Sequence, residues 1–165
     1  MSDEHATEQR PPRARQGNAR HKAREFVVQG LYQHLVGGQD EAAIRVQAES
    51  DEEFSQASRP LFEALLARTL GDLEALRTLL EPFIARRWAE VSPIERSILL
   101  IGACELRDHP ETPYRVVINE AIELAKAYGG TDGHKFVNGV LDKLVAKLRP
   151  DEVAANGRPL PRRAG

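Results

Sequence analysis

The chain has 165 residues, of which 41% are hydrophobic and 29% are charged, and its formal net charge is −2. This length suffices for one domain with a substantial core and excludes two large ones. The near-neutral charge excludes a protein that is basic overall, so any nucleic-acid affinity must come from a local patch. The single cysteine excludes an intramolecular disulfide framework, and no apolar run reaches the length of a membrane span or a signal-peptide core. A cytoplasmic protein is therefore expected.

The composition also indicates the fold class. Aromatic residues make up only 5% of the chain, whereas alanine, leucine, glutamate and arginine are frequent. These residues favour helices over a β-sandwich or a barrel, so we predict an all-α protein.

The N-terminal residues 1–19 include two adjacent prolines and almost nothing apolar, and we predict a disordered tail. Six cations accumulate from the end of this tail into the first helix with no acidic residue among them: Arg10, Arg13, Arg15, Arg20, Lys22 and Arg24. Cations at a helix N-terminus oppose the helix macrodipole. This placement favours an anionic partner over a helix start that is merely solvated.

The first predicted helix directs one apolar stripe inward, comprising Ala23, Phe26, Val27, Gly30, Leu31 and Leu35. Its N-terminal turns are expected to expose Arg20, His21, Lys22 and Arg24. The pair Gly37-Gly38 is expected to end it, and the weakly periodic segment 40–55 predicts at most a short helix.

Strong helical periodicity returns over residues 58–84, which predicts one long helix or two consecutive ones, with Gly71 or Pro82 as the break. The sequence SPIE at 92–95 is a capping box with proline at the first helical position. It predicts a core helix that begins at this point.

Two further core helices joined by a glycine-rich turn are predicted over 113–148. The turn has the sequence GGTDG at 129–133, where the first glycines are expected to adopt positive φ and Asp132 to cap the following helix. The polar, proline-rich residues 150–165 predict a disordered tail. The folded domain therefore spans residues 20–149, as a compact bundle of about seven helices.

Sequence patterns of catalytic or metal sites are not found. The glycine-rich turn does not have the spacing of a phosphate-binding loop, and no histidine lies in a metal-binding motif. Glu120 and Glu123 fit the solvated face of a helix better than an acid/base pair. We expect no enzyme activity, no metal and no cofactor.

Binding of single-stranded RNA has stronger support, because such RNA is held by cations along its phosphates and by aromatic rings that stack on bases. Candidate cations are Arg20, His21, Lys22, Arg24, Lys135 and Arg86, and candidate rings are Tyr128 and Phe136. For Phe136, packing in the core is as good an interpretation as stacking.

Several stretches resemble the NusB family of transcription antitermination proteins: INEAIELAK at 118–126, HKFVNGVLDK at 134–143, ARE at 23–25, LYQ at 31–33 and ERSILLIGACEL at 95–106. The resemblance covers roughly residues 20–149 and is weak over 36–58. It implies two packed three-helix halves.

The resemblance also implies a non-enzymatic factor that binds the boxA element of nascent RNA together with the ribosomal small-subunit protein NusE. The pair then joins NusA, NusG and RNA polymerase to suppress termination, chiefly in ribosomal RNA operons. The positions that match the family's RNA-binding residues are Arg20, Lys22, Arg24, Tyr128, Asp132, Lys135 and Phe136. Tyr32 and Glu95 match its partner-binding positions.

Two alternatives remain at this point. One is an RNA-binding accessory domain of the kind found in ribosomal RNA methyltransferases, which would require a cofactor-binding domain downstream. The other is a protein-only helical scaffold, in which the basic N-terminal arm serves solubility alone.

Overall fold

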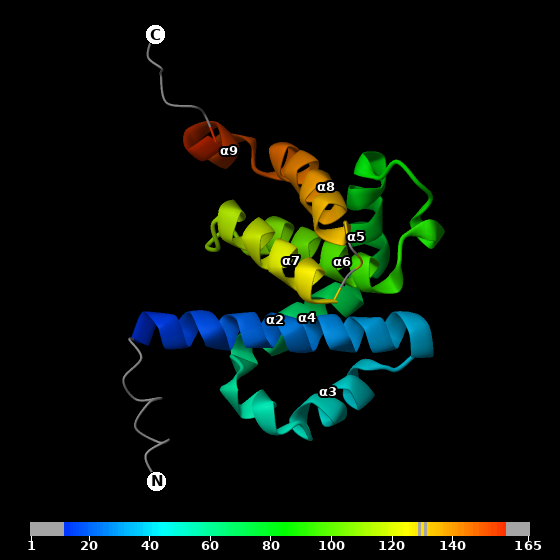
Figure 1. Cartoon of the computed structure of the whole chain (residues 1–165), viewed down its shortest axis with the longest axis vertical. Coiled ribbons are helices and arrows are strands. Elements are labelled where there is room, and N and C mark those ends of the chain that lie inside the picture. Colours follow the sequence, from blue (N-terminus) through cyan, green and yellow to red (C-terminus); the bar gives the residue numbers. More distant parts are fainter. Residues whose placement is uncertain (1–11, 129, 131, 158–165) are drawn as a thin grey trace. The chain divides into compact units, whose positions relative to one another are not determined.

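The computed structural model describes residues 12–128, 130 and 132–157, and these residues form helices with no strand (Figure 1). The all-α prediction is confirmed, with eight α-helices in the described part against about seven expected. The α-helices are α2 (Pro12–Gly37), α3 (Glu41–Glu49), α4 (Arg59–Gly71), α5 (Leu73–Leu80), α6 (Pro93–Asp108), α7 (Tyr114–Tyr128), α8 (Gly133–Leu148) and α9 (Pro150–Gly157). Three short 3-10 helices are η1 (Glu52–Gln56), η2 (Glu81–Phe83) and η3 (Trp88–Glu90).

The chain divides at Leu70 and Gly71 into two compact units. In the first unit, α2 packs against α3 and η1. Three phenylalanines from α2, η1 and α4 meet edge to face, with centroid distances of 5.1 Å for Phe26 to Phe54 and 4.9 Å for Phe54 to Phe62. Such aromatic pairs contribute about 0.5–1.5 kcal/mol beyond the area that they bury.

Local sequence signals explain how α2 and α3 are bounded. Gly38 has a φ of +74° and donates its N–H to the carbonyl of His34 at 2.9 Å, which confirms the glycine pair as the end of α2. Asp40 then caps α3 by accepting the N–H of Ala43 at 2.9 Å. The short helix predicted within 40–55 is therefore present.

The boundaries of the two predicted tails differ from the structure. Residues 12–19 are the start of α2 rather than a disordered segment, and 150–157 form α9. An anchored helix extends by one hydrogen bond for each residue fixed, so extension needs no apolar burial of its own. The anchor in α2 is the carbonyl of Ala19, which accepts the N–H of Ser58 at 2.9 Å. Residues 1–11 and 158–165 lie outside the described part.

In the second unit, α6 is buried over most of its length, and α5, α7 and α8 pack against it. The capping box is confirmed on its serine side, because Ser92 Oγ accepts the N–H of Glu95 at 3.2 Å. A Cβ on Gly102 would lie 2.9 Å from Leu141 Cδ1, so glycine allows α6 and α8 to approach closely. Both predicted breaks occur, since α4 ends at Gly71 and Pro82 lies in η2.

Arg149, between α8 and α9, joins three helix ends of this unit. Its side chain is only 8% exposed. It donates to the backbone carbonyls of Glu105 (3.0 Å), Leu106 (2.9 Å), His109 (2.8 Å) and Thr112 (2.7 Å). Glu105 and Leu106 lie in the last turn of α6, where backbone carbonyls run out of partners further along the helix. The carbonyls of Glu105 and His109 also accept the backbone N–H groups of His109 and Thr112. Arg149 thus supplies the C-terminal cap of α6 from 40 or more residues away.

Glu152, in the first turn of α9, completes this connection. It accepts the N–H of Tyr114 at 2.8 Å, at the start of α7, and one N–H of Arg149 at 2.9 Å. The Tyr114 N–H and the Arg149 guanidinium lower the pKa of the Glu152 carboxyl below its ordinary value. These bonds explain why the first residues after Arg149 are helical.

Candidate nucleic-acid interface

Because α2 begins at Pro12, the predicted cations Arg20, His21 and Lys22 lie more than two turns inside the helix and not at its N-terminus, so the predicted unfavourable interaction with the helix macrodipole does not apply to them. Lys22 and His21 also have acidic neighbours. Lys22 Nζ lies 2.7 Å from Glu53 Oε1 and 3.5 Å from Glu25 Oε1. His21 Nε2 lies 3.3 Å from Glu25 Oε2. The hydrogen bond that Lys22 donates to Glu53, together with the negative charges of Glu25 and Glu53, raises the pKa of the Lys22 ammonium. A phosphate that binds Lys22 must therefore compete with Glu53, which is 31 residues away in the sequence.

The expected exposure of Arg24 is wrong, because this residue is 2% exposed. Arg24, Val28 and Leu31 follow one another at steps of four and three residues, and all three are buried. α2 is thus buried over a wider arc than the stripe that the sequence analysis identified. In the sequence, this second buried stripe is indicated by Val28, an apolar residue that lies outside the predicted stripe. Arg20, His21 and Lys22 remain partly exposed.

The second group of predicted RNA residues lies around the start of α8. The guanidinium of Arg86 is 4.2 Å from the ring centroid of Phe136, which is a cation–π pair. Phe136 is half-buried, whereas Arg86 and Lys135 are exposed. Phe136 is thus neither a fully buried core residue nor a fully exposed aromatic ring. Tyr128, the last residue of α7, is 37% exposed.

Asp132 does not act as the predicted cap, since its side chain accepts no capping hydrogen bond from the described residues. A capping residue needs an extended backbone, and Asp132 has φ −112° and ψ 15°. Its Oδ1 instead lies 3.5 Å from Lys135 Nζ, and both side chains are more than 70% exposed. Positive φ was predicted for both Gly129 and Gly130. Gly129 lies outside the described residues, and Gly130 does not have the predicted positive φ.

The two predicted partner residues differ in accessibility. Tyr32 is 41% exposed, as expected for a ring outside the α2 stripe. Glu95 is only 8% exposed, and its Oε2 lies 2.6 Å from the point where a Cβ on Gly133 would stand. The Glu95 carboxylate therefore packs against the first residue of α8. Sequence analysis missed this contact because 38 residues separate the pair and glycine offers no side-chain signal.

The two groups of predicted RNA residues belong to different units. Among the described residues, no helix is long and apolar enough to cross a membrane. Within the same part of the chain, no cluster of three histidine, cysteine or acidic residues could hold a metal ion.

These features define an all-α protein with a cationic stretch of α2 in one unit and a corner with cationic and aromatic side chains in the other. The family model described as NusB family matches residues 21–146. The transcription antitermination protein NusB of Dechloromonas aromatica is 54% identical over 145 residues, which cover 88% of this chain and 86% of the relative. The NusB protein of Azoarcus sp. is 56% identical over 138 residues, which cover 83% of this chain and 89% of the relative. This chain belongs to the NusB family of transcription antitermination proteins.

Two solved structures have a similar fold. NusB from T. maritima superposes with a TM-score of 0.68 at 26% identity, covering 80% of this chain and 94% of that chain. A crystal structure of the antitermination factors NusB and NusE in complex with dsRNA superposes with a TM-score of 0.66 at 21% identity. The match covers 83% of this chain and 99% of that chain. The second comparison supports the fold alone.

Proposed function

We propose that this chain binds the boxA element of nascent ribosomal RNA transcripts together with the ribosomal protein NusE. The resulting complex joins NusA, NusG and RNA polymerase in the cytoplasm and suppresses termination without catalysing a reaction. Family membership supports this function. The observation that carries the RNA-binding part is the corner at the start of α8, where Arg86 covers Phe136 and Lys135 is exposed.

In this proposal, the phosphates of the RNA contact Arg20, Lys22 and Lys135, and one unpaired base stacks on the corner. Guanidinium planes as well as aromatic rings stack on bases, so the Arg86 and Phe136 pair forms a two-layered platform. Arg24 contributes by holding α2 in place, because it is buried. His21, Tyr128 and Asp132 border the path of the RNA.

Neither alternative is favoured. A protein-only scaffold would not need an exposed cation over an aromatic ring. The match to stand-alone NusB proteins extends over 86% and 89% of their length, which favours an antitermination factor over a methyltransferase accessory domain.

The phosphate contacts predict a salt-dependent affinity. If three to five phosphates are bound, the slope of log K against log salt should be roughly −2 to −3.5, at about 0.7 per phosphate on a single strand. Replacing both Arg20 and Lys22 by alanine should make this slope less negative by about 1.4. It should also lower the affinity for all RNA sequences by the same factor. Fluorescence anisotropy with a labelled boxA-like RNA and a scrambled RNA measures both effects.

The matched control replaces Lys143 and Lys147, two exposed lysines of α8, by alanine. It removes the same charge from a part of α8 outside the proposed RNA path, and the slope should stay within error of the unmodified chain. An affinity independent of salt, or equal losses of affinity in both double variants, would rule out specific contacts of the RNA with Arg20 and Lys22.

A further inference from the structure

The N-cap and first turn of η1 are acidic, since Asp51, Glu52 and Glu53 follow one another, and all three are exposed. η1 packs against α2 within the first unit. From η1, the Glu53 carboxylate reaches Lys22 of α2 and accepts a hydrogen bond from its ammonium, with 2.7 Å between Oε1 and Nζ. Glu53 therefore lies at the place that the proposed function assigns to a phosphate of the RNA.

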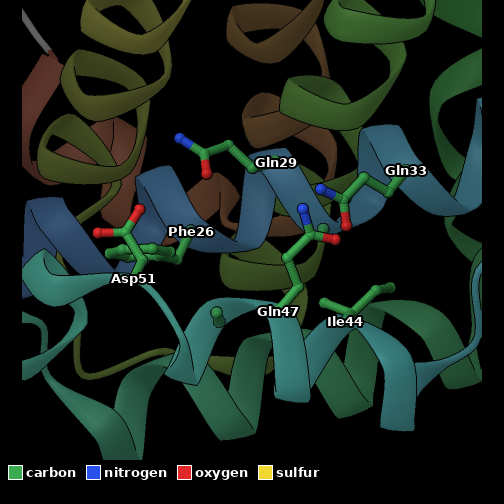
Figure 2. Close-up of a pocket in the computed structure, with 8 residues that line it drawn as sticks. Phe26, Gln29, Gln33, Ile44, Gln47 and Asp51 are labelled. Carbon is green, nitrogen blue, oxygen red and sulfur yellow. The ribbon is translucent and has the colours of Figure 1, made fainter.

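The core of the first unit holds Glu53 at this place. Phe54, the next residue, is buried and packs edge to face against Phe26, with 5.1 Å between the ring centroids. Phe26 lies four residues after Lys22, so the two side chains share one side of α2. Asp51 caps η1 by accepting the N–H of Glu53 at 2.8 Å, and Figure 2 shows Asp51 beside Phe26 at one end of a small pocket between α2 and α3. The backbone of Glu53 is thus fixed by the residue on its C-terminal side and by the cap of η1.

Lys22 can pass from Glu53 to a phosphate without a change in the backbone of α2. Its ammonium is a compact charge with three donors on a flexible stem, and its side chain is 27% exposed. The Glu53 side chain is 62% exposed, so a phosphate has access to the same position. An RNA phosphate that binds Lys22 therefore replaces one anion by another, and the chain loses one hydrogen bond for each that it gains.

We propose that Glu53 is an autoinhibitory residue, whose carboxylate takes the place of an RNA phosphate at Lys22 and lowers the affinity for RNA. This inference rests on the proposed function, which assigns Lys22 to a phosphate. Because phosphate contacts carry no sequence information, Glu53 lowers the affinity for every RNA by the same factor. An RNA held by phosphates alone has no further contact that offsets this loss, whereas one that also stacks a base on the Arg86 and Phe136 pair does.

Glu53→Gln tests the proposal by fluorescence anisotropy with the boxA-like and the scrambled RNA. The amide keeps the shape of the side chain and removes its charge, and the cap of η1 stays because the capping carboxylate belongs to Asp51. From the typical strength of an exposed ion pair, the affinity for both RNAs should rise by about two- to fivefold. The salt slope should stay the same, since the number of bound phosphates does not change. An unchanged or lower affinity would overturn the proposal.

Glu52→Gln is the matched control for this variant. Glu52 is an exposed glutamate of the same 3-10 helix, and within the described part of the chain its carboxylate pairs with no cation. The two variants have the same net charge, but Glu52→Gln should change the RNA affinity little. Equal increases in both variants would mean that η1 acts through its overall charge, and the role assigned to Glu53 would be wrong.

The ion pair itself can be observed by NMR of the Lys22 ammonium in the full chain without RNA. Its hydrogens should exchange with water more slowly in the unmodified chain and in Glu52→Gln than in Glu53→Gln, because the hydrogen bond to Glu53 protects them. Equal exchange in the three proteins would show that Glu53 does not hold Lys22 in solution, which also overturns the proposal.

A double-mutant cycle shows whether the effect of Glu53 depends on Lys22. Lys22→Ala should weaken RNA binding, and adding Glu53→Gln to it should raise the affinity no more than Glu52→Gln does, because no ammonium is left to release. The same two- to fivefold rise with and without Lys22 would contradict the proposal. If Lys22→Ala weakens RNA binding but Glu53→Gln alone does not strengthen it, the proposed function stands and this inference fails. If the unmodified chain and Glu53→Gln bind neither RNA, the proposed function fails, and this inference fails with it.

Discussion

Replacement of Arg149 by alanine is expected to lower the melting temperature of the chain by roughly 6–12 °C. The side chain is 8% exposed and donates to four backbone carbonyls and to Glu152. Leaving buried acceptors without their charged donor costs about 3 kcal/mol, and 1 kcal/mol corresponds to about 2–4 °C for a chain of this size. Thermal unfolding followed by circular dichroism measures the change.

Arg87→Ala is the control for this prediction. Arg87 is also an arginine of the second unit, but it is 82% exposed and, among the residues that the structure describes, pairs only with Glu90. Such exposed pairs contribute about 0.2–1 kcal/mol, so the melting temperature should fall by about 4 °C at most. Similar losses in the two variants would show that Arg149 is not the cap that joins α6, α7 and α9.

Glu95→Lys is expected to damage the corner at the start of α8 as well as the partner surface. The Glu95 carboxylate packs against Gly133, at the positive end of the α8 dipole, and is 8% exposed. A buried lysine at this point places an unpaired cation beside that positive end, which costs about 3 kcal/mol or more. The melting temperature should fall, and the isolated chain should lose at least about tenfold in RNA affinity, a loss of about 1.4 kcal/mol.

Two further variants separate this effect from a change of net charge. Glu123→Lys makes the same charge change at an exposed site on α7 and should alter neither the melting temperature nor the RNA affinity. Glu95→Gln keeps the shape of the side chain and should cost about 1 kcal/mol, the typical size of a dipole interaction. If Glu95→Lys weakened NusE binding alone and left melting and RNA affinity unchanged, Glu95 would be the surface contact that the sequence predicts.

Helix positions were largely predictable because their signals are local. The SPIE capping box, the glycine pair after α2 and the break at Gly71 each depend on residues within one turn of the boundary. The apolar periodicity of 113–148 likewise placed α7 and α8. The family resemblance, which rests on contiguous motifs, was confirmed for the same reason.

The errors concern contacts between residues far apart in the sequence. The pairing of Lys22 with Glu53, and of Glu95 with Gly133, has no local signature. The boundary of the C-terminal tail was misplaced because Arg149 and Glu152 order α9 by bonding to helix ends about 40 residues earlier. The boundary of the N-terminal tail was misplaced because Ser58 anchors α2 at the carbonyl of Ala19. Asp132 was predicted to cap α8 because aspartate is a common capping residue, but its backbone dihedral angles are not those of a capping residue.

The most direct test of the proposed function is anisotropy of a labelled boxA-like RNA and a scrambled RNA, titrated with the chain in the presence and absence of purified NusE. If the RNA lies across both proteins, NusE should raise the affinity for the boxA-like RNA by about tenfold or more, because the second contact becomes intramolecular. The scrambled RNA should gain little. Equal affinities for the two RNAs, or no effect of NusE on either, would contradict the proposal that this chain reads boxA jointly with NusE.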